Sequence, residues 1–217
     1  TVKADGMAVS AEADSTFLQI GTSTTITAGN TQVSIGNTAA SLKLATPLNV
    51  ASNIAYNATA DAESTTTPTK FTSASDILWG AAYSSNPSQV QESNVPTLLQ
   101  SVNGYVYSTK LYVNVADNGK NGSDLKLSSV TVTGTNTIKD ALRVMVVCGG
   151  KYMVYDAGLT ANAITGDAAL LETITTTAHE LTVYIWFDGT DAVSKNDTAT
   201  NLGELSCALE FTCSIAA

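Results

Sequence analysis

The stretch from Glu180 to Phe211 constrains the fold more than any other part of the chain. Its first half alternates two sets of large side chains: Leu181, Val183, Ile185 and Phe187 in one set, and Thr182, Tyr184 and Trp186 in the other. This period of two is typical of a β-strand, and bulky residues on both faces predict a central strand. After a turn signal at Asp188-Gly189 and a polar loop, alternation returns from Leu205 to Ile215 with one apolar face. We interpret both strands as the closing section of an all-β sandwich.

Length and charge narrow the classes of function. A chain of 217 residues can form one β-sandwich domain, and we expect a single domain over residues 1–217. The net charge of -9 leaves no basic surface for a phosphate backbone, which argues against nucleic acid and anionic membrane surfaces as partners. No run approaches the roughly 18 apolar residues of a membrane helix, so we expect no membrane insertion.

The composition indicates an exported protein. Only 13% of residues are charged, and Thr, Ser, Ala, Asn and Gly fill much of the rest. This composition favours strands and uncharged loops over surface helices. We therefore expect an extracellular or cell-surface location, with a cytosolic β-protein of low charge as the alternative. The chain begins at Thr1 without a leader, which we interpret as an export signal already removed.

The first thirteen residues have the pattern of a strand with small apolar side chains. Val2 and Ala4 share one phase, the phase shifts at Asp5 and Gly6, and alternation then continues at Met7, Val9, Ala11 and Ala13. No strand precedes this segment to form a hairpin with it. It must therefore pair elsewhere in the fold or with another molecule.

The middle of the chain divides into three parts. Up to about Val50, short apolar clusters predict a meander of short strands, separated by turn signals at Gly21, Gly29-Asn30, Gly36-Asn37 and Pro47. Residues 51–102 are irregular, and we expect an excursion on the sandwich with a short helix near residues 75–82. Residues 141–155, ALRVMVVC-GG-KYMVY, predict a β-hairpin that turns at Gly149-Gly150.

No catalytic or metal motif is recognisable. His179 is the only histidine and belongs to no HExxH or His/Cys pattern, so we expect an ordinary residue in a surface loop. One loop does gather the oxygen ligands that Ca²⁺ prefers, at Asp188, Asp191, Asn196 and Asp197. Their spacing is not that of an EF-hand, and turn formation by Asp and Asn explains them as well. We predict no enzyme activity, no catalytic residue, no cofactor and no metal site.

Three cysteines, Cys148, Cys207 and Cys213, cannot all pair within one molecule. On one straight strand Cys207 and Cys213 would lie about 20 Å apart, which is beyond disulfide reach. Two interpretations stay open. Cys207 and Cys213, which point to the inner face, are small buried hydrophobic residues, or Cys148 pairs with one of them across neighbouring strands.

Four segments together resemble a known family. They are DGMAVSAEADSTFLQI (residues 5–20), YVYSTKLYVNV (105–115), ALRVMVVCGGKYMVY (141–155) and VYIWFDGTDAVSKND (183–197). The chain resembles the TasA and camelysin-like secreted fibre-forming proteins of Firmicutes. Camelysin-like proteins carry a metalloprotease label, but this sequence lacks the usual zinc ligands, so the activity is not carried over.

The resemblance implies a jelly-roll-like β-sandwich and polymerisation by strand exchange. In such fibres the N-terminal strand of one subunit completes a sheet of the next, with main-chain hydrogen bonds for affinity and alternate side chains for register. Here residues 1–13 would be the donor arm, and the interface side chains would be Val2, Ala4, Met7, Val9 and Ala11. A head-to-tail contact of this kind does not close, so it produces a filament.

The sequence therefore predicts a structural subunit of an extracellular, biofilm-type filament. Its partner would be a further copy of itself, with glycans or other matrix components as candidates. The alternative is a monomeric surface adhesin or glycan-binding module. In that case Trp79 and Tyr83 in the irregular excursion would form the contact face.

Overall fold

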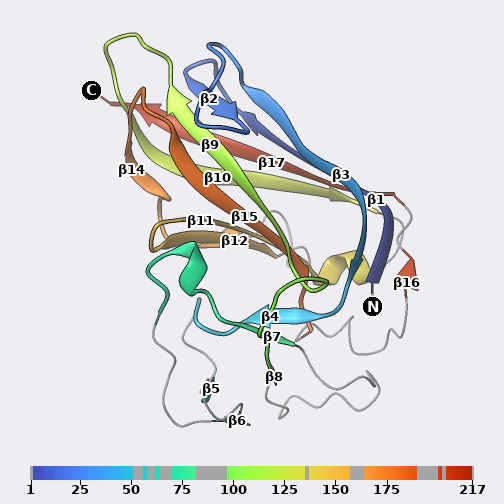
Figure 1. Ribbon diagram of the computed structural model, residues 1–217. Helices are drawn as coiled ribbons and strands as arrows, with labels where there is room; N and C mark the ends of the chain where they lie inside the picture. The colour runs from blue at the N-terminus through green and yellow to red at the C-terminus, as the bar shows by residue number, and fades with distance from the viewer. Residues whose placement is uncertain are drawn as a thin grey trace.

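Two mixed or antiparallel sheets pack face to face in the computed structural model, which describes residues 2–50, 56–57, 62–63, 70–81, 97–134, 137–156, 164–189, 200–201 and 204–216 (Figure 1). Sheet A contains, in spatial order, β14 (Leu171–Ile174), β10 (Gly122–Thr133), β17 (Glu204–Ile215) and β1 (Val2–Ala13), with β16 (Thr200–Asn201) and β3 (Gln32–Leu42) both paired to β1. Sheet B contains β13 (Ile164–Gly166), β12 (Lys151–Asp156), β11 (Leu142–Cys148), β15 (His179–Phe187), β9 (Tyr107–Val115) and β2 (Leu18–Gly21). The all-β sandwich expected from the sequence is confirmed.

Strand β15 has the central position that its two large faces predicted. It pairs with β11 on one side and with β9 on the other. Its inward residues, Leu181, Val183, Ile185 and Phe187, belong to the main core between the sheets, and its outward aromatic residues, Tyr184 and Trp186, belong to a second core. Bulky side chains on both faces are therefore explained by two separate cores on either side of one strand.

The second core lies under a small sheet that covers part of the outer face of sheet B. This sheet consists of β4 (Ala45–Pro47), β7 (Trp79–Ala81) and β8 (Thr97–Leu98), and it lies at the lower end of the sandwich in Figure 1. A separate pair, β5 (Tyr56–Asn57) and β6 (Ala62–Glu63), lies below it. Trp79 contacts the rings of Tyr184 and Trp186, with centroids 5.4 and 5.0 Å away. The described parts of the excursion thus extend the hydrophobic interior.

The short helix predicted near residues 75–82 is wrong in extent and type. The chain forms one 3₁₀ turn, η1 (Ala74–Asp76), and then enters β7. The Asp76 carboxylate accepts hydrogen bonds from the Ser73 backbone N–H and the Thr72 hydroxyl. These bonds, first of all the one from Thr72, lower the pKa of Asp76. Asp76 therefore stabilises a turn, and pairing with β4 draws the following residues into a strand.

Two other predictions in the middle of the chain have different outcomes. The β11–β12 hairpin is confirmed, with Cys148 opposite Lys151 and the first turn residue, Gly149, at a φ of 55°. The turn predicted at Gly36-Asn37 is wrong, because both residues lie inside β3. A glycine is needed at position 36 for a close approach to a tyrosine, as described below. The Gly-Asn pair, which is typical of a turn, here marks this close contact within a strand.

Candidate functional site

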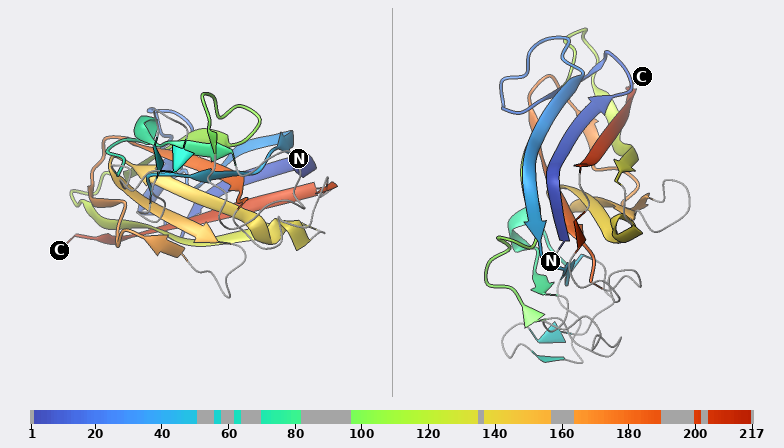
Figure 2. Two further views of the ribbon diagram at one scale, coloured as in Figure 1. Left: turned by 90° about the horizontal axis from the view of Figure 1, so that it is seen from below. Right: turned by 90° about the vertical axis from the view of Figure 1, so that its right-hand side faces the viewer.

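Strand β1, the predicted donor arm, lies in the middle of sheet A of its own chain. It runs parallel to β17 from Gly6 opposite Glu204 to Ala13 opposite Phe211. On its other edge it runs antiparallel to β3, and near its start it also pairs with β16. Figure 2 shows β3, β1 and β17 side by side in the right-hand view. Of the two possibilities that the sequence left open, this conformation shows pairing elsewhere in the fold, because both edges of β1 are occupied by strands of the same chain.

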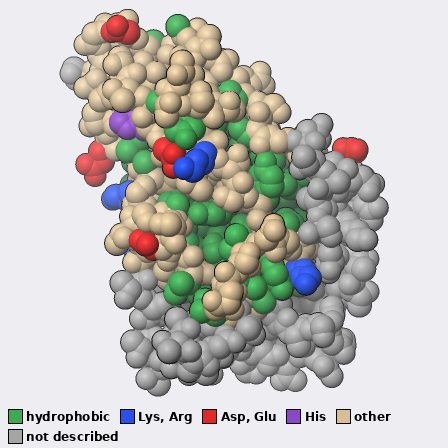
Figure 3. Space-filling view, in the orientation of Figure 1, with side chains coloured by type: hydrophobic (Ala, Val, Ile, Leu, Met, Phe, Trp, Pro, Cys, Tyr) green, Lys and Arg blue, Asp and Glu red, His purple; other side chains and the backbone are tan. Residues whose placement is uncertain are grey.

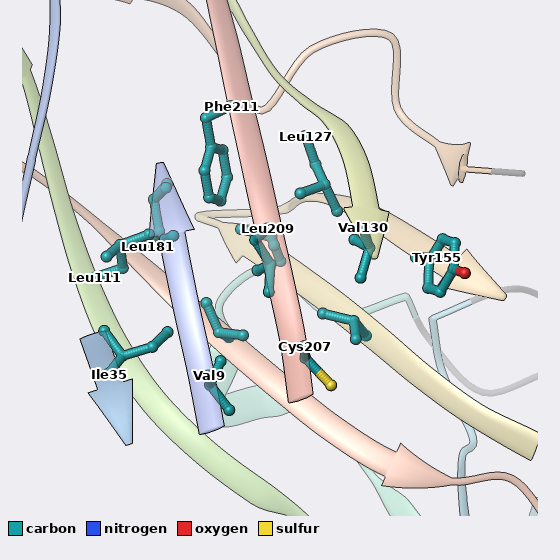
Figure 4. Packing of buried hydrophobic residues seen from close by; sticks show 14 of the residues in the cluster. Val9, Ile35, Leu111, Leu127, Val130, Tyr155, Leu181, Cys207, Leu209 and Phe211 are labelled. Carbon is teal, nitrogen blue, oxygen red and sulfur yellow. The ribbon is translucent and has the colours of Figure 1, made fainter. Parts of the chain in front are cut away.

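The side chains of β1 that the sequence singled out enter the main core. Met7 and Val9 are 1% exposed and Ala11 is fully buried. They lie in register with Leu205, Cys207 and Leu209 of β17, which belong to the same core. Figure 4 shows Val9, Cys207 and Leu209 in this core. For Val2 and Ala4 the structure describes the strand pairing, opposite Leu42 and Ala40, and not the side chains.

The phase shift that the sequence shows at Asp5 and Gly6 is a β-bulge. Ala4 pairs with Ala40 of β3 and Met7 with Thr38, so β1 has one more residue than β3 over this interval. An extra residue reverses the facing of every side chain beyond it. The bulge therefore explains why the apolar positions change from even to odd numbers while the strand continues.

β1 is connected to the rest of the described fold by a short segment, residues 14–17. Asp14, Ser15 and Thr16 are exposed, and the chain passes over them from sheet A into β2 of sheet B. The backbone N–H of Asp14 donates to the carbonyl of Phe211 at 3.1 Å. A few exposed hinge residues thus separate a strand of sheet A from the rest of the sandwich.

Strand β3 flanks β1 on the side away from β17, and bonds that do not involve β1 attach it to the rest of the fold. The Tyr107 hydroxyl of β9 donates to the Ile35 carbonyl at 2.7 Å. A β-carbon at Gly36 would overlap that hydroxyl, which is why glycine is required there. At the start of β3, the Asn30 side chain donates to the Ile20 carbonyl at 2.7 Å and the Asn30 carbonyl accepts from the Ile20 N–H. Beyond its end, the Lys43 N–H donates to Gly104.

One electrostatic feature lies on the seam between β1 and β17. Glu12 of β1 is in register with Glu210 of β17, so two carboxylates stand side by side across the seam. The Ser128 hydroxyl of β10 donates to Glu210 Oε1 at 3.1 Å. Neighbouring like charges across paired strands disfavour the pairing. The two glutamates therefore oppose the pairing of β1 with β17 close to residues 14–17.

His179 helps to form the turn between β14 and β15. It is the first residue of β15, so the prediction of a loop position is wrong. The Thr175 backbone N–H donates to its Nε2 atom at 3.1 Å, which closes the turn between β14 and β15. Partial burial lowers the pKa of His179. An imidazole nitrogen that accepts a backbone N–H must be unprotonated. We assign His179 to turn formation.

The predicted acidic loop is only partly described. The Asp188 carboxylate is buried and accepts hydrogen bonds from Trp186 Nε1 at 3.1 Å and from the Thr46 hydroxyl at 3.4 Å. Asp191, Asn196 and Asp197 lie outside the described residues. Among the described residues, no group of three or more His, Cys, Asp and Glu side chains is arranged to hold a metal ion. None of the described helical segments has the length and hydrophobicity of a membrane span.

The three cysteines are free thiols in this structure. Cys207 is 1% exposed within the main core, and burial raises the pKa of its thiol to about 12. Burial likewise raises the pKa of Cys213 to about 11. Cys148 and Cys213 pack against the same core. The interpretation as a small buried residue is confirmed for Cys207, whereas Cys213 is only partly buried, and Cys148 is paired with neither of them in this structure.

Trp79, one of the two residues of the proposed glycan contact face, is not accessible to a glycan. Trp79 is only 4% exposed and its ring is enclosed by Tyr184 and Trp186, so its face is not open to a sugar. Tyr83 lies outside the described residues. Comparison with known proteins adds no relative: no family model, no curated protein and no solved structure matches this chain.

Proposed function

We propose that the protein is a structural subunit of an extracellular filament, in which copies join head to tail by exchange of β1. The first strand of one copy would occupy the groove between β3 and β17 of the next, and the jelly-roll topology implied by the resemblance is part of the same proposal. One observation carries it. β1 supplies a central strand and core side chains to sheet A, yet only residues 14–17 connect it to the strand that follows.

The same contacts can form within one chain or between two. Exchange replaces the pairing of β1 with its own β17 by identical pairing with the β17 of a neighbour, so enthalpy changes little. Short hinge segments favour such swapping, since a tight reversal relaxes when the strand extends to a neighbour. Because each copy gives its strand to one neighbour and receives one from another, the contact is heterologous and produces an open filament.

The wall of the groove supports this role. Tyr107, Asn30 and Lys43 hold β3 to the remainder of the fold by bonds that do not involve β1. If β1 leaves, β3 therefore keeps anchors at both ends and at its centre. The vacated groove would expose an apolar floor that includes Leu205, Cys207 and Leu209, which only another strand with matching side chains can cover. Burial of one Val or Met side chain contributes about 1.5–3 kcal/mol.

The extracellular location rests on the surface composition. Figure 3 shows a face on which charged side chains are few and widely spaced among polar and apolar atoms. Only 13% of the whole chain is charged. A surface that is both weakly charged and rich in Ser and Thr suits subunits that pack in a matrix.

A reversible disulfide that ties β1 to β17 of its own chain, called the β1 lock below, tests the proposal directly. Ser10 and Ala208 are in register on neighbouring strands, and both are partly exposed, so Ser10→Cys with Ala208→Cys places a disulfide across the seam. The oxidised protein should form no filaments and the reduced protein should form them, as seen by negative-stain microscopy. The native thiols are buried at Cys207 and partly buried at Cys148 and Cys213, and burial raises the pKa of each, so they will compete little for oxidation.

A matched control uses the other edge of β17. Thr131 of β10 is in register with Ala208, so Thr131→Cys with Ala208→Cys forms a disulfide within sheet A that leaves β1 free. This control should assemble in both redox states. Filaments of normal length from the oxidised β1 lock would rule out strand exchange. Absence of filaments from the unmodified chain under all assembly conditions would contradict the filament function itself.

A further inference from the structure

Among the described strands, the longest one at a sheet edge carries no charge and no proline that would protect it from pairing with another chain. Strand β3 has 11 residues, and in the described part of the chain β1 is its only ladder partner. The other outer strands of the two main sheets are β14, β16, β13 and β2, none longer than four residues. Free main-chain N–H and C=O groups along a sheet edge form a template for a further strand.

The composition of β3 is unusual for such an edge. Natural proteins block edges with lysine, other charges, proline, bulges or short strands. The sequence of β3, QVSIGNTAASL, has no charged residue and no proline. Its pairing with β1 does shift between Val9 and Ser10, where Ile35 is the extra residue, and the Ile35 carbonyl is occupied by the Tyr107 hydroxyl. Beyond that irregularity, Gly36–Leu42 continues as seven residues of strand, and the second shift in this pairing, opposite Thr38 and Ala40, comes from an extra residue in β1 and not in β3.

The chemistry of this edge points to a second copy of the same chain. The protein carries a net charge of -9, so two copies repel one another, and an uncharged contact keeps close pairs of like charge out of their interface. Gln32 and Ser34 are exposed and neutral, and no described side chain of β3 adds charge. A basic partner would instead be attracted to the acidic surface elsewhere. A two-fold antiparallel contact is self-complementary, because the same strand faces itself with equal hydrogen-bonding capacity.

We propose that the free edge of β3, centred on Gly36–Leu42, pairs antiparallel with the same edge of a second copy, so that sheet A continues across a two-fold contact. This contact uses the edge of β3 that faces away from β1. It is therefore independent of strand exchange and would form between monomers or between neighbouring filaments.

The test uses the oxidised Ser10→Cys/Ala208→Cys protein, in which strand exchange is blocked. Sedimentation equilibrium should show a concentration-dependent shift from one chain to two. When two β3 strands pair antiparallel about residue 37, 38 or 39, Asn37→Lys with Ala39→Lys places lysines of the two copies opposite one another. This variant should therefore weaken dimerisation roughly tenfold or more. Ser108→Lys with Thr131→Lys adds the same charge at exposed positions on β9 and β10 rather than on β3, and should leave the dimer intact.

Hydrogen exchange of the locked protein without lysine substitutions supplies a second measurement, which does not depend on how well a variant folds. Backbone amides of β3 should become protected as concentration rises, whereas those of the edge strand β14 should not. The proposal is overturned if the locked protein remains a single chain up to about 1 mM. It is equally overturned if a dimer forms without added protection of β3, or if both lysine pairs weaken it equally.

Discussion

The Tyr107 hydroxyl donates a hydrogen bond to the Ile35 carbonyl at 2.7 Å and thereby joins β9 of sheet B to β3 of sheet A. The ring can approach only because position 36 is a glycine. Tyr107 is a residue of one sheet that fixes the far wall of the groove in the other. The contact makes that wall independent of the strand that fills the groove.

Gly36→Ala should lower the free energy of unfolding by about 1–3 kcal/mol, because its β-carbon overlaps the Tyr107 hydroxyl. Tyr107→Phe alone should cost about 0.5–1.5 kcal/mol through the lost hydrogen bond. In the double variant the alanine should cost less than in the wild type, since the nearest ring carbon would be 3.3 Å from that β-carbon. Urea denaturation of all four proteins measures this coupling. Simple additivity of the two changes would contradict the proposed clash.

Trp79→Ala should destabilise the protein by about 3–5 kcal/mol, since the ring is buried between Tyr184 and Trp186. Trp79→Phe keeps an aromatic ring in the second core and should cost clearly less. Thermal and urea unfolding compare the two variants. A loss below about 1 kcal/mol for Trp79→Ala would show that the small sheet contributes little to the fold.

Stability should fall at acid pH through His179. Its folded pKa is lowered by burial, so its contribution is complete above the unfolded pKa of about 6.5. As the pH falls below that value, the unfolded chain binds a proton that the folded chain resists, and the contribution is lost as pH falls through the folded pKa. His179→Gln removes this term, so the stability difference between wild type and variant should shift in favour of the variant between pH 7.5 and pH 5. A pH-independent difference would contradict the assignment.

Glu12→Lys should strengthen the seam between β1 and β17 by about 0.2–1 kcal/mol, because it replaces a like-charged pair with an opposite pair beside Glu210. Asp117→Lys changes the net charge equally at an exposed position outside the strands of both sheets. Urea midpoints at low salt should rise more for Glu12→Lys, and the gain should shrink at high salt. An equal rise in both variants would identify a general charge effect instead.

All three cysteines should titrate as free thiols once the protein is denatured, and only slowly while it is folded. Cys207 should be the slowest, because it is almost fully buried with its pKa raised to about 12. Ellman titration with and without denaturant measures this. Detection of only one thiol under denaturing, non-reducing conditions would restore the pairing of Cys148 with another cysteine.

The positions of many strands followed from the alternation of apolar and polar residues in the sequence. The same alternation predicted which of their side chains face the core. The two faces of β15, the β11–β12 hairpin and the phase shift at Asp5-Gly6 could all be read from the sequence, because each depends on neighbours a few residues apart. Only the pairing with β3 identified that shift as a bulge. The failures have a local cause as well. Gly36-Asn37 and the segment after Asp76 have turn and cap residues, but pairing with β1 and β4 respectively overrides those preferences.

The pairing of β1 was the part that no local pattern could supply. The sequence by itself determined that residues 2–13 form a strand and that Met7, Val9 and Ala11 share its apolar face, since a strand alternates with a period of two. Only the tertiary structure decided that this face is covered by its own chain, between β3 and β17 at the opposite end of the sequence. Main-chain hydrogen bonds are the same for every partner, so the choice depends on which long-range arrangement buries the apolar face in both sheets at once.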